Sequence, residues 1–153
     1  MPEKYDRLSF IFVKNKGNKT AHIRINGCSF IELLSFTETR IKELNDDAHT
    51  GNYNYLNPCV LYENLINAQT EGTYERENGA PLVCCKSCGD IYCWSVYALI
   101  ERNENSVVWT LRHNHRNWDY GLKFCFEREK YDTELRLLRC YLDRITESAV
   151  NNP

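Results

Sequence analysis

The residues best suited to chemistry gather in one stretch, residues 83–120, which holds four of the eight cysteines, two of the four histidines and all three tryptophans. Within it, the run Cys85-Lys-Ser-Cys88-Gly89 has the form of a zinc knuckle. Two thiolates at this spacing can bind one ion, and glycine permits the tight turn between them. With Cys93 close behind, the spacing predicts a site for zinc or another metal that prefers soft ligands.

The fourth ligand has to come from another part of the chain. His113 and His115 follow a predicted strand hairpin, and an antiparallel hairpin returns the chain to the place where it began. Four protein ligands would make a bound zinc structural, whereas catalysis would need an open coordination position. The alternative is that these cysteines are reduced, buried and act as small apolar side chains. The predicted ligand set is Cys85, Cys88, Cys93 and His115, with Cys84 or His113 as substitutes.

Two kinds of thiol chemistry are less well supported. A redox pair at Cys85 and Cys88 would need to begin a helix, but the residues beyond have the pattern of a strand. A cysteine nucleophile assisted by His115 and Asp119 has no recognised sequence signature here. Glycine-rich phosphate loops and the H-E-x-x-H motif are absent from the sequence. A metal-dependent or thiol enzyme centred on Cys85/Cys88/Cys93/His115 therefore stays the alternative function.

A second group of residues, 113–120, combines cations, aromatic rings and an acid. Such a loop either is held by contacts between its own side chains or binds a partner. The contacts within the loop would be an ion pair between Arg116 and Asp119 and stacking of Arg116 on Trp118. As a binding site the loop would suit an anion or an acidic partner, with Arg116 as its anchor. The predicted partner-binding residues are His113, Arg116, Trp118, Asp119 and Tyr120.

Several motifs in this order resemble a family of small uncharacterised bacterial proteins. The most specific are Cys88-Gly-x-x-x-Cys93-Trp94 and His115-Arg116-x-Trp118-Asp119-Tyr120. The resemblance covers roughly residues 24–138. The family pattern has a cysteine and a glycine where this chain has Lys86 and Tyr92, and Cys85 would replace the missing thiol by a slip of one residue. The resemblance implies a shared fold and no particular activity.

The elements that would position these residues begin with a hairpin. Residues 7–13 and 20–25 alternate apolar and polar side chains around a turn-forming segment, which predicts two antiparallel strands. Ser29 followed by Glu32 fits a capping box, so a helix should begin near Phe30. Further along, residues 45–81 are irregular, apart from a short helix capped by Asn57 and ending near Asn67.

The second half of the chain predicts a strand meander and a long helix. Residues 94–101 and 106–111 are rich in β-forming side chains and flank a polar turn, while residues 122–126 alternate aromatic and polar positions. Residues 127–147 carry apolar side chains at the spacing of one helix face. Residues 148–153 are expected to fray.

Composition limits the class of protein. With 153 residues and no linker, the chain should form one domain, and a net charge of −2 disfavours a nucleic-acid binder. No signal peptide or membrane-spanning run is seen, so we expect a cytoplasmic protein without a membrane partner. A reducing compartment favours thiols or metal ligands over disulfides. The oligomeric state has no signal in the sequence.

Together these patterns predict a single α+β domain, residues 1–153, in which two main helices pack on an antiparallel sheet built from the N-terminal hairpin and the C-terminal meander. The expected function is that of a non-enzymatic cytosolic interaction or inhibitor protein, of the immunity or anti-defence type, stabilised by a structural zinc knuckle. Its expected partner is another protein, because the chain combines aromatic, polar loops with no catalytic signature.

Overall fold

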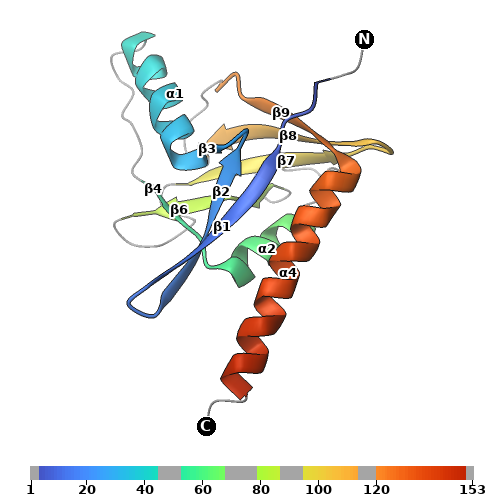
Figure 1. The fold of residues 1–153 in the computed structure, drawn as a ribbon. Coiled ribbons are helices and arrows are strands. Elements are labelled where there is room, and N and C mark those ends of the chain that lie inside the picture. The colour runs from blue at the N-terminus through green and yellow to red at the C-terminus, as the bar shows by residue number, and fades with distance from the viewer. Residues whose placement is uncertain (1–3, 45–52, 68–78, 87–94, 114–119, 151–153) are drawn as a thin grey trace.

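The computed structural model describes residues 4–44, 53–67, 79–86, 95–113 and 120–150, and its described elements form an α+β fold, as predicted (Figure 1). All pairings between its named strands are antiparallel. The elements in chain order are β1 (Leu8–Asn15), β2 (Asn18–Ile25), β3 (Cys28–Ser29), α1 (Phe30–Leu44), β4 (Tyr53–Tyr55), α2 (Pro58–Asn67), β5 (Ala80–Pro81), β6 (Val83–Cys85), β7 (Val96–Arg102), β8 (Ser106–His113), β9 (Lys123–Glu127) and α4 (Arg128–Val150).

The predicted N-terminal hairpin is confirmed as β1 and β2, which pair from Leu8↔Ile25 to Asn15↔Asn18. Its two-residue turn has positive φ at both positions, 52° at Lys16 and 85° at Gly17. Those angles belong to a type I′ turn, whose twist matches that of the flanking strands. The strand β3 extends this sheet in the order β1-β2-β3, which leaves β1 at one edge.

The C-terminal meander is also confirmed, in a four-stranded sheet of order β5-β7-β8-β9. The prediction of one sheet holding both hairpin and meander was wrong, because they belong to different sheets. Among the described residues, a single strand bridge links the two, the parallel bridge between Asp6 and Phe126 of β9. Beyond that bridge β1 diverges from β9, since α4 begins directly after β9 and occupies the space alongside.

The sequence did not predict the short strands β4 and β5, which lie in the irregular region, or β6, which follows it; β4 pairs with β6, and β5 pairs with β7. They are two or three residues long, too short for alternation to be recognised in a sequence. The predicted helix from Pro58 to Asn67 is confirmed as α2, and the Asn57 side chain caps it by accepting a 2.8 Å hydrogen bond from the Cys59 amide.

The helix α1 begins at Phe30 as predicted, but its N-terminal contact comes from another element. The Tyr55 hydroxyl accepts a 3.1 Å hydrogen bond from the Ile31 amide and lies 2.7 Å from the Ser29 hydroxyl. The long helix α4 is confirmed, and it continues through residues 148–150, where fraying was expected. Within the described residues, no helix is long and apolar enough to cross a membrane.

The core lies between the sheets and the helices. Trp109 of β8 is fully buried and meets Phe126 of β9 and Tyr131 of α4 edge to face, with ring centroids 5.1 and 6.0 Å apart. Its indole nitrogen also donates a 3.2 Å hydrogen bond to the Tyr131 hydroxyl. These contacts fix the first turns of α4 against the meander. The start of α4 is thereby placed beside the N-terminal hairpin (Figure 1).

Candidate functional site

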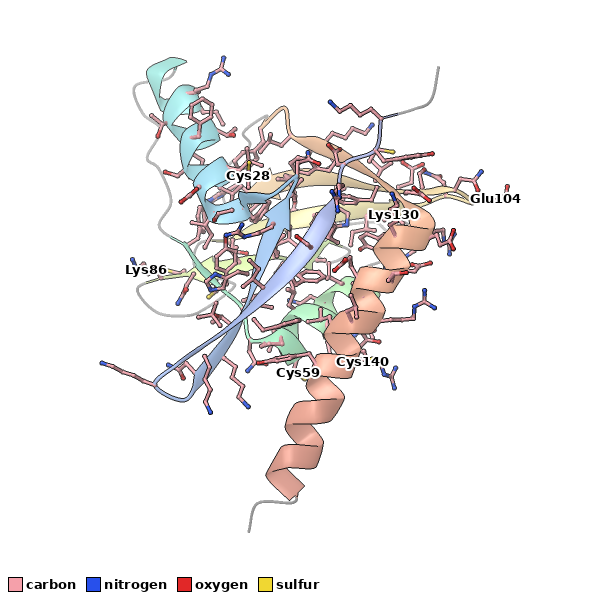
Figure 2. The ribbon with its side chains drawn as sticks, in the orientation of Figure 1. Cys28, Cys59, Lys86, Glu104, Lys130 and Cys140 are labelled. Carbon is pink, nitrogen blue, oxygen red and sulfur yellow. The ribbon has the colours of Figure 1, made fainter. Side chains whose placement is uncertain are left out.

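Of the predicted metal ligands, the structure describes only Cys85, while Cys88, Cys93 and His115 lie outside the described residues. Cys85 is buried on β6, 8% exposed, and pairs across the small sheet with Tyr53. Three other cysteines are exposed, on β3, α2 and α4 (Figure 2): Cys28, Cys59 and Cys140. No group of three or more His, Cys, Asp or Glu side chains that could hold a metal occurs in the described part of the chain.

The strand ends that lead to the predicted metal ligands do lie together. β7 begins at Val96, which pairs with His113 at the end of β8. The Leu82 amide donates a 3.0 Å hydrogen bond to the Val96 carbonyl, and the Ser95 hydroxyl donates one of 2.9 Å to the Val83 carbonyl. The segments 87–94 and 114–119 therefore both leave from one end of the sheet. The hairpin return on which the metal prediction relied is confirmed; the metal itself stays a prediction.

The predicted recognition loop is described only at its two ends. His113 is 4% exposed on β8 and Tyr120 is 5% exposed, so both side chains are buried in the protein interior and do not face solvent. Arg116, Trp118 and Asp119 lie outside the described residues. The Tyr120 hydroxyl donates a 3.0 Å hydrogen bond to Oε2 of Glu38, a carboxylate on α1 that is only 1% exposed. Tyr120 thus anchors the end of the loop, and a partner-binding role for the loop stays a prediction.

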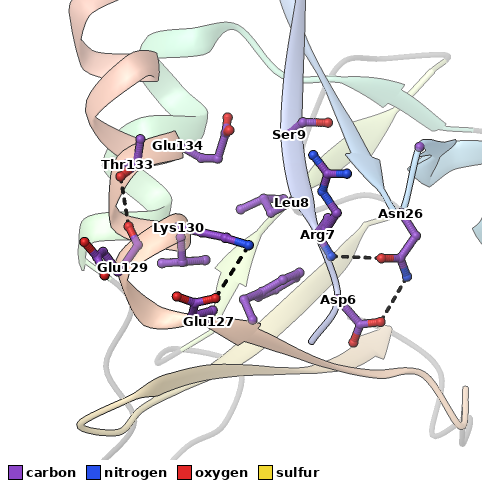
Figure 3. A pocket seen from close by; sticks show the side chains of 13 residues that line it. Asp6, Arg7, Leu8, Ser9, Asn26, Glu127, Glu129, Lys130, Thr133 and Glu134 are labelled. Atoms are coloured by element: carbon purple, nitrogen blue, oxygen red, sulfur yellow. Dashed lines mark hydrogen bonds and ion pairs between the residues drawn. The ribbon is translucent and has the colours of Figure 1, made fainter. Parts of the chain in front are cut away.

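A cavity of about 760 Å³ lies between β1 and α4, where β1 diverges from β9 (Figure 3). Its floor is apolar, built from Leu8, Phe126 and Tyr131. Figure 3 shows β1 with α4 on one side and the turn that contains Asn26 on the other. The cavity is lined by Asp6, Arg7, Leu8, Ser9, Asn26, Gly27, Phe126, Glu127, Glu129, Lys130, Tyr131, Thr133 and Glu134.

A second cavity, of about 300 Å³, continues along the same two elements. It is mostly apolar, with Phe12 of β1 stacked on Tyr141 of α4 at a centroid distance of 3.9 Å. Leu137 also lines it and is 53% exposed. Glu134 lines both cavities, and we call the two together the β1–α4 groove: residues 6–12 on one side and residues 127–141 on the other.

Several polar groups form hydrogen bonds with one another at the end of the groove near Asp6. Oδ1 of Asn26 accepts a 2.8 Å hydrogen bond from the Arg7 amide, and its Nδ2 donates one of 2.9 Å to Asp6. The other carboxylate oxygen of Asp6 accepts a 2.9 Å hydrogen bond from the Cys125 amide. Asn26 has a φ of 55°, in the left-handed region that asparagine tolerates better than most residues. The hairpin end is thereby tied to β9.

The charge in the groove is unevenly distributed. Of the charged side chains that line it, four are acidic and two are basic. Asp6 is hydrogen-bonded as above, and Glu127 lies 3.6 Å from Lys130. Burial raises the pKa of Glu134, while the positive charge of Arg7 acts in the opposite direction. The groove is acidic around Glu134 and apolar toward Phe12 and Leu137.

No motif in the sequence indicates the groove. Asp6, Arg7, Asn26 and Glu134 are far apart along the chain and match no motif. Asn26-Gly27 has the composition of a turn, and the contact of Asn26 with Asp6 depends on how the hairpin meets β9. Compared with known proteins, the chain matches no family model, no curated protein and no solved structure.

Proposed function

We propose that the chain is a non-enzymatic interaction protein, which binds and blocks another protein through the β1–α4 groove. The observation that carries the proposal is the combination of an edge strand, apolar side chains and unbalanced acidic charge along one groove. Concave sites that combine an apolar lining with a few polar groups are the usual form of a binding site. An immunity or anti-defence protein would be one concrete form of this function.

The edge of β1 adds main-chain groups to this surface. Asn15 and Asn18 flank a two-residue turn and therefore form a hydrogen-bonded pair. Every second residue back along β1 then forms such a pair with its partner on β2. The amide and carbonyl groups of Ser9, Ile11 and Val13 therefore point to β2, and those of Leu8, Phe10 and Phe12 point away from it. Within the described residues, those outward groups have no hydrogen-bonding partner.

A structural zinc site completes the proposal. Cys85, Cys88, Cys93 and His115 would bind the ion where segments 87–94 and 114–119 leave the sheet. Support comes from the shared strand end at Val96 and His113. The enzymatic alternative at the same residues would need an open coordination position. Zinc would then hold the two segments together, at the opposite end of β7 and β8 from the turn at residues 103–105.

Capture of partners from cells in which the protein is made tests the proposed function. The variant Leu137→Glu places a charge in the apolar part of the groove, and Phe36→Glu is its matched control, since Phe36 is 64% exposed on α1, a helix outside the groove. We expect wild type and Phe36→Glu to retain the same partner and Leu137→Glu to lose it. Retention by Leu137→Glu, or capture of no partner at any salt concentration, would overturn the proposal.

A further inference from the structure

The open side of β1 faces the groove, so main-chain and side-chain recognition can occur in one place. β2 occupies one edge of β1, and α4 stands beyond the other (Figure 3). The side chains of Leu8, Phe10 and Phe12 lie on the strand face shared with Ile25, Ile23 and Ala21, which are buried. An unpaired edge of this kind is a ready template for an added strand.

We infer that the occupant of the groove is an extended segment of the partner protein, which adds as a strand to the open edge of β1 and carries a lysine or arginine that reaches Glu134, with apolar side chains against Phe12 and Leu137. This inference rests on the proposed function and names the partner's chemistry. Main-chain hydrogen bonds would supply affinity, and the alternate side chains would supply specificity.

The lengths of the two walls agree with a strand. Residues 6–12 of β1 span about 20 Å at the rise of a β-strand. Residues 127–141 cover about 21 Å at the rise of an α-helix. A segment of about six or seven residues would therefore match the two walls in length, and it would end where the rings of Phe12 and Tyr141 stack on each other. Its side chains alternate between two faces, so the cation and the apolar residues would occupy alternate positions.

Charge favours a basic segment over a second copy of this chain. Glu134 has its pKa raised by burial, and a cation from the partner would offset that cost by favouring the ionised carboxylate. In a second copy, the one lysine of β1 is Lys14, next to the hairpin turn, and residues 8–13 carry no charge, so the middle of that strand would bring no cation to Glu134. An acidic segment would meet two cations, Arg7 and Lys130, against four acidic side chains, and Lys130 already lies 3.6 Å from Glu127.

The inference is tested by selecting random extended peptides from a display library against the full chain. The selected peptides should share a lysine or arginine with apolar residues at alternate positions. Each selected peptide is then synthesised in two versions, with backbone N-methyl groups on its odd-numbered residues in one version and on its even-numbered residues in the other. Strand addition predicts that one set abolishes binding and the other is tolerated, because only alternate amides face β1.

Variants of the chain test the cation. Glu134→Gln should weaken the selected peptides about tenfold, the scale of a lost hydrogen bond to a charged group. Asp132→Asn, an exposed acid on the same helix that lines neither cavity, should change their affinity by less than about twofold. Because burial raises the pKa of Glu134, its neutral replacement should fold at least as well as wild type, which separates lost binding from unfolding.

The outcomes separate the two proposals. Peptides that bind in the groove but tolerate both methylated sets would overturn strand addition. Peptides that prefer no cation would overturn the pairing with Glu134. Either result would leave the groove as the binding surface. A dimer of this chain that forms through β1 would overturn the inference by showing a second copy as the occupant. Peptides whose binding is unaffected by Leu137→Glu would overturn the proposed function together with the inference.

Discussion

Tyr120 and Glu38 are 82 residues apart in the chain, yet the Tyr120 hydroxyl donates a 3.0 Å hydrogen bond to Oε2 of Glu38. The Tyr53 hydroxyl donates a second bond, of 2.7 Å, to the same oxygen. A carboxylate buried as deeply as Glu38 is costly unless hydrogen bonds satisfy it. The two tyrosines therefore tie α1 to β4 and to the start of the segment that leads into β9.

Replacing Glu38 with glutamine should destabilise the protein by about 1–3 kcal/mol, because two hydrogen bonds to a charged group would be weakened in a buried site. Glu32→Gln, an exposed position on the same helix, is the matched control and should leave the free energy of unfolding nearly unchanged. Urea titration measures both variants. Equal stability of the two variants would show that the Glu38 cluster contributes nothing.

The protein should lose stability in alkali, and Tyr131 should contribute to the loss. Burial raises the pKa of Tyr131 from 10.0 to about 12, although its hydrogen bond from Trp109 acts the other way. In the unfolded chain the hydroxyl ionises first, so the stabilisation is complete below pH 10 and disappears as the pH rises through 12. Burial, with Tyr53 and Glu38 nearby, also raises the pKa of Tyr120 and gives the same sign.

Urea titrations at a series of alkaline pH values, with tyrosinate absorbance as a second signal, measure this dependence. Tyr131→Phe should lower the free energy of unfolding near neutral pH, since the Trp109 indole loses its acceptor. Its stability should then fall less steeply with rising pH than that of wild type. Identical slopes for wild type and Tyr131→Phe would contradict the assigned pKa shift.

Asn26→Ala should destabilise the hairpin end by about 2 kcal/mol. The change removes the bonds to Arg7 and Asp6, and it leaves alanine in the left-handed region that asparagine tolerates. Asn18→Ala provides the control, because Asn18 is an exposed asparagine beside the other turn of the same hairpin. Urea unfolding compares them, and a loss no greater than that of Asn18→Ala would show that the Asn26 contacts are unimportant.

The zinc proposal predicts about one zinc per chain in protein purified under reducing conditions, with three or four thiols protected from modification. Cys88→Ser should lower the zinc content and destabilise the fold. Cys140→Ser, at an exposed position on α4, should do neither. Metal analysis with thiol counting decides the matter. No metal in the native protein, and eight reactive thiols after unfolding, would remove the zinc site.

Elements with strong local signals could be predicted from the sequence. The hairpin turn at Lys16-Gly17, the Asn57 cap and the apolar stripe of α4 each depend on residues close together in the chain. The cap of α1 was different. Its amide contact comes from Tyr55, a residue on another strand, so local spacing at Ser29 could not reveal it.

The candidate site depended on tertiary arrangement, which local patterns do not encode. Glu134 has the spacing of an ordinary solvent-facing helix residue until β1 is placed beside α4. Likewise, β1 lies at an edge because the hairpin and the meander form separate sheets, and no pattern in the sequence indicates that separation. The cysteine spacing remains a prediction from sequence, since three of its four ligands lie outside the described residues.

Residue-resolved amide exchange of the chain, alone and with its captured partner, tests the central claim most directly. The amides of Leu8, Phe10 and Phe12 face the open edge, whereas those of Ser9, Ile11 and Val13 already bond to β2. We predict that the partner slows exchange at the first three amides and leaves the other three nearly unchanged. Unchanged exchange at Leu8, Phe10 and Phe12 in the saturated complex would contradict binding along the β1–α4 groove.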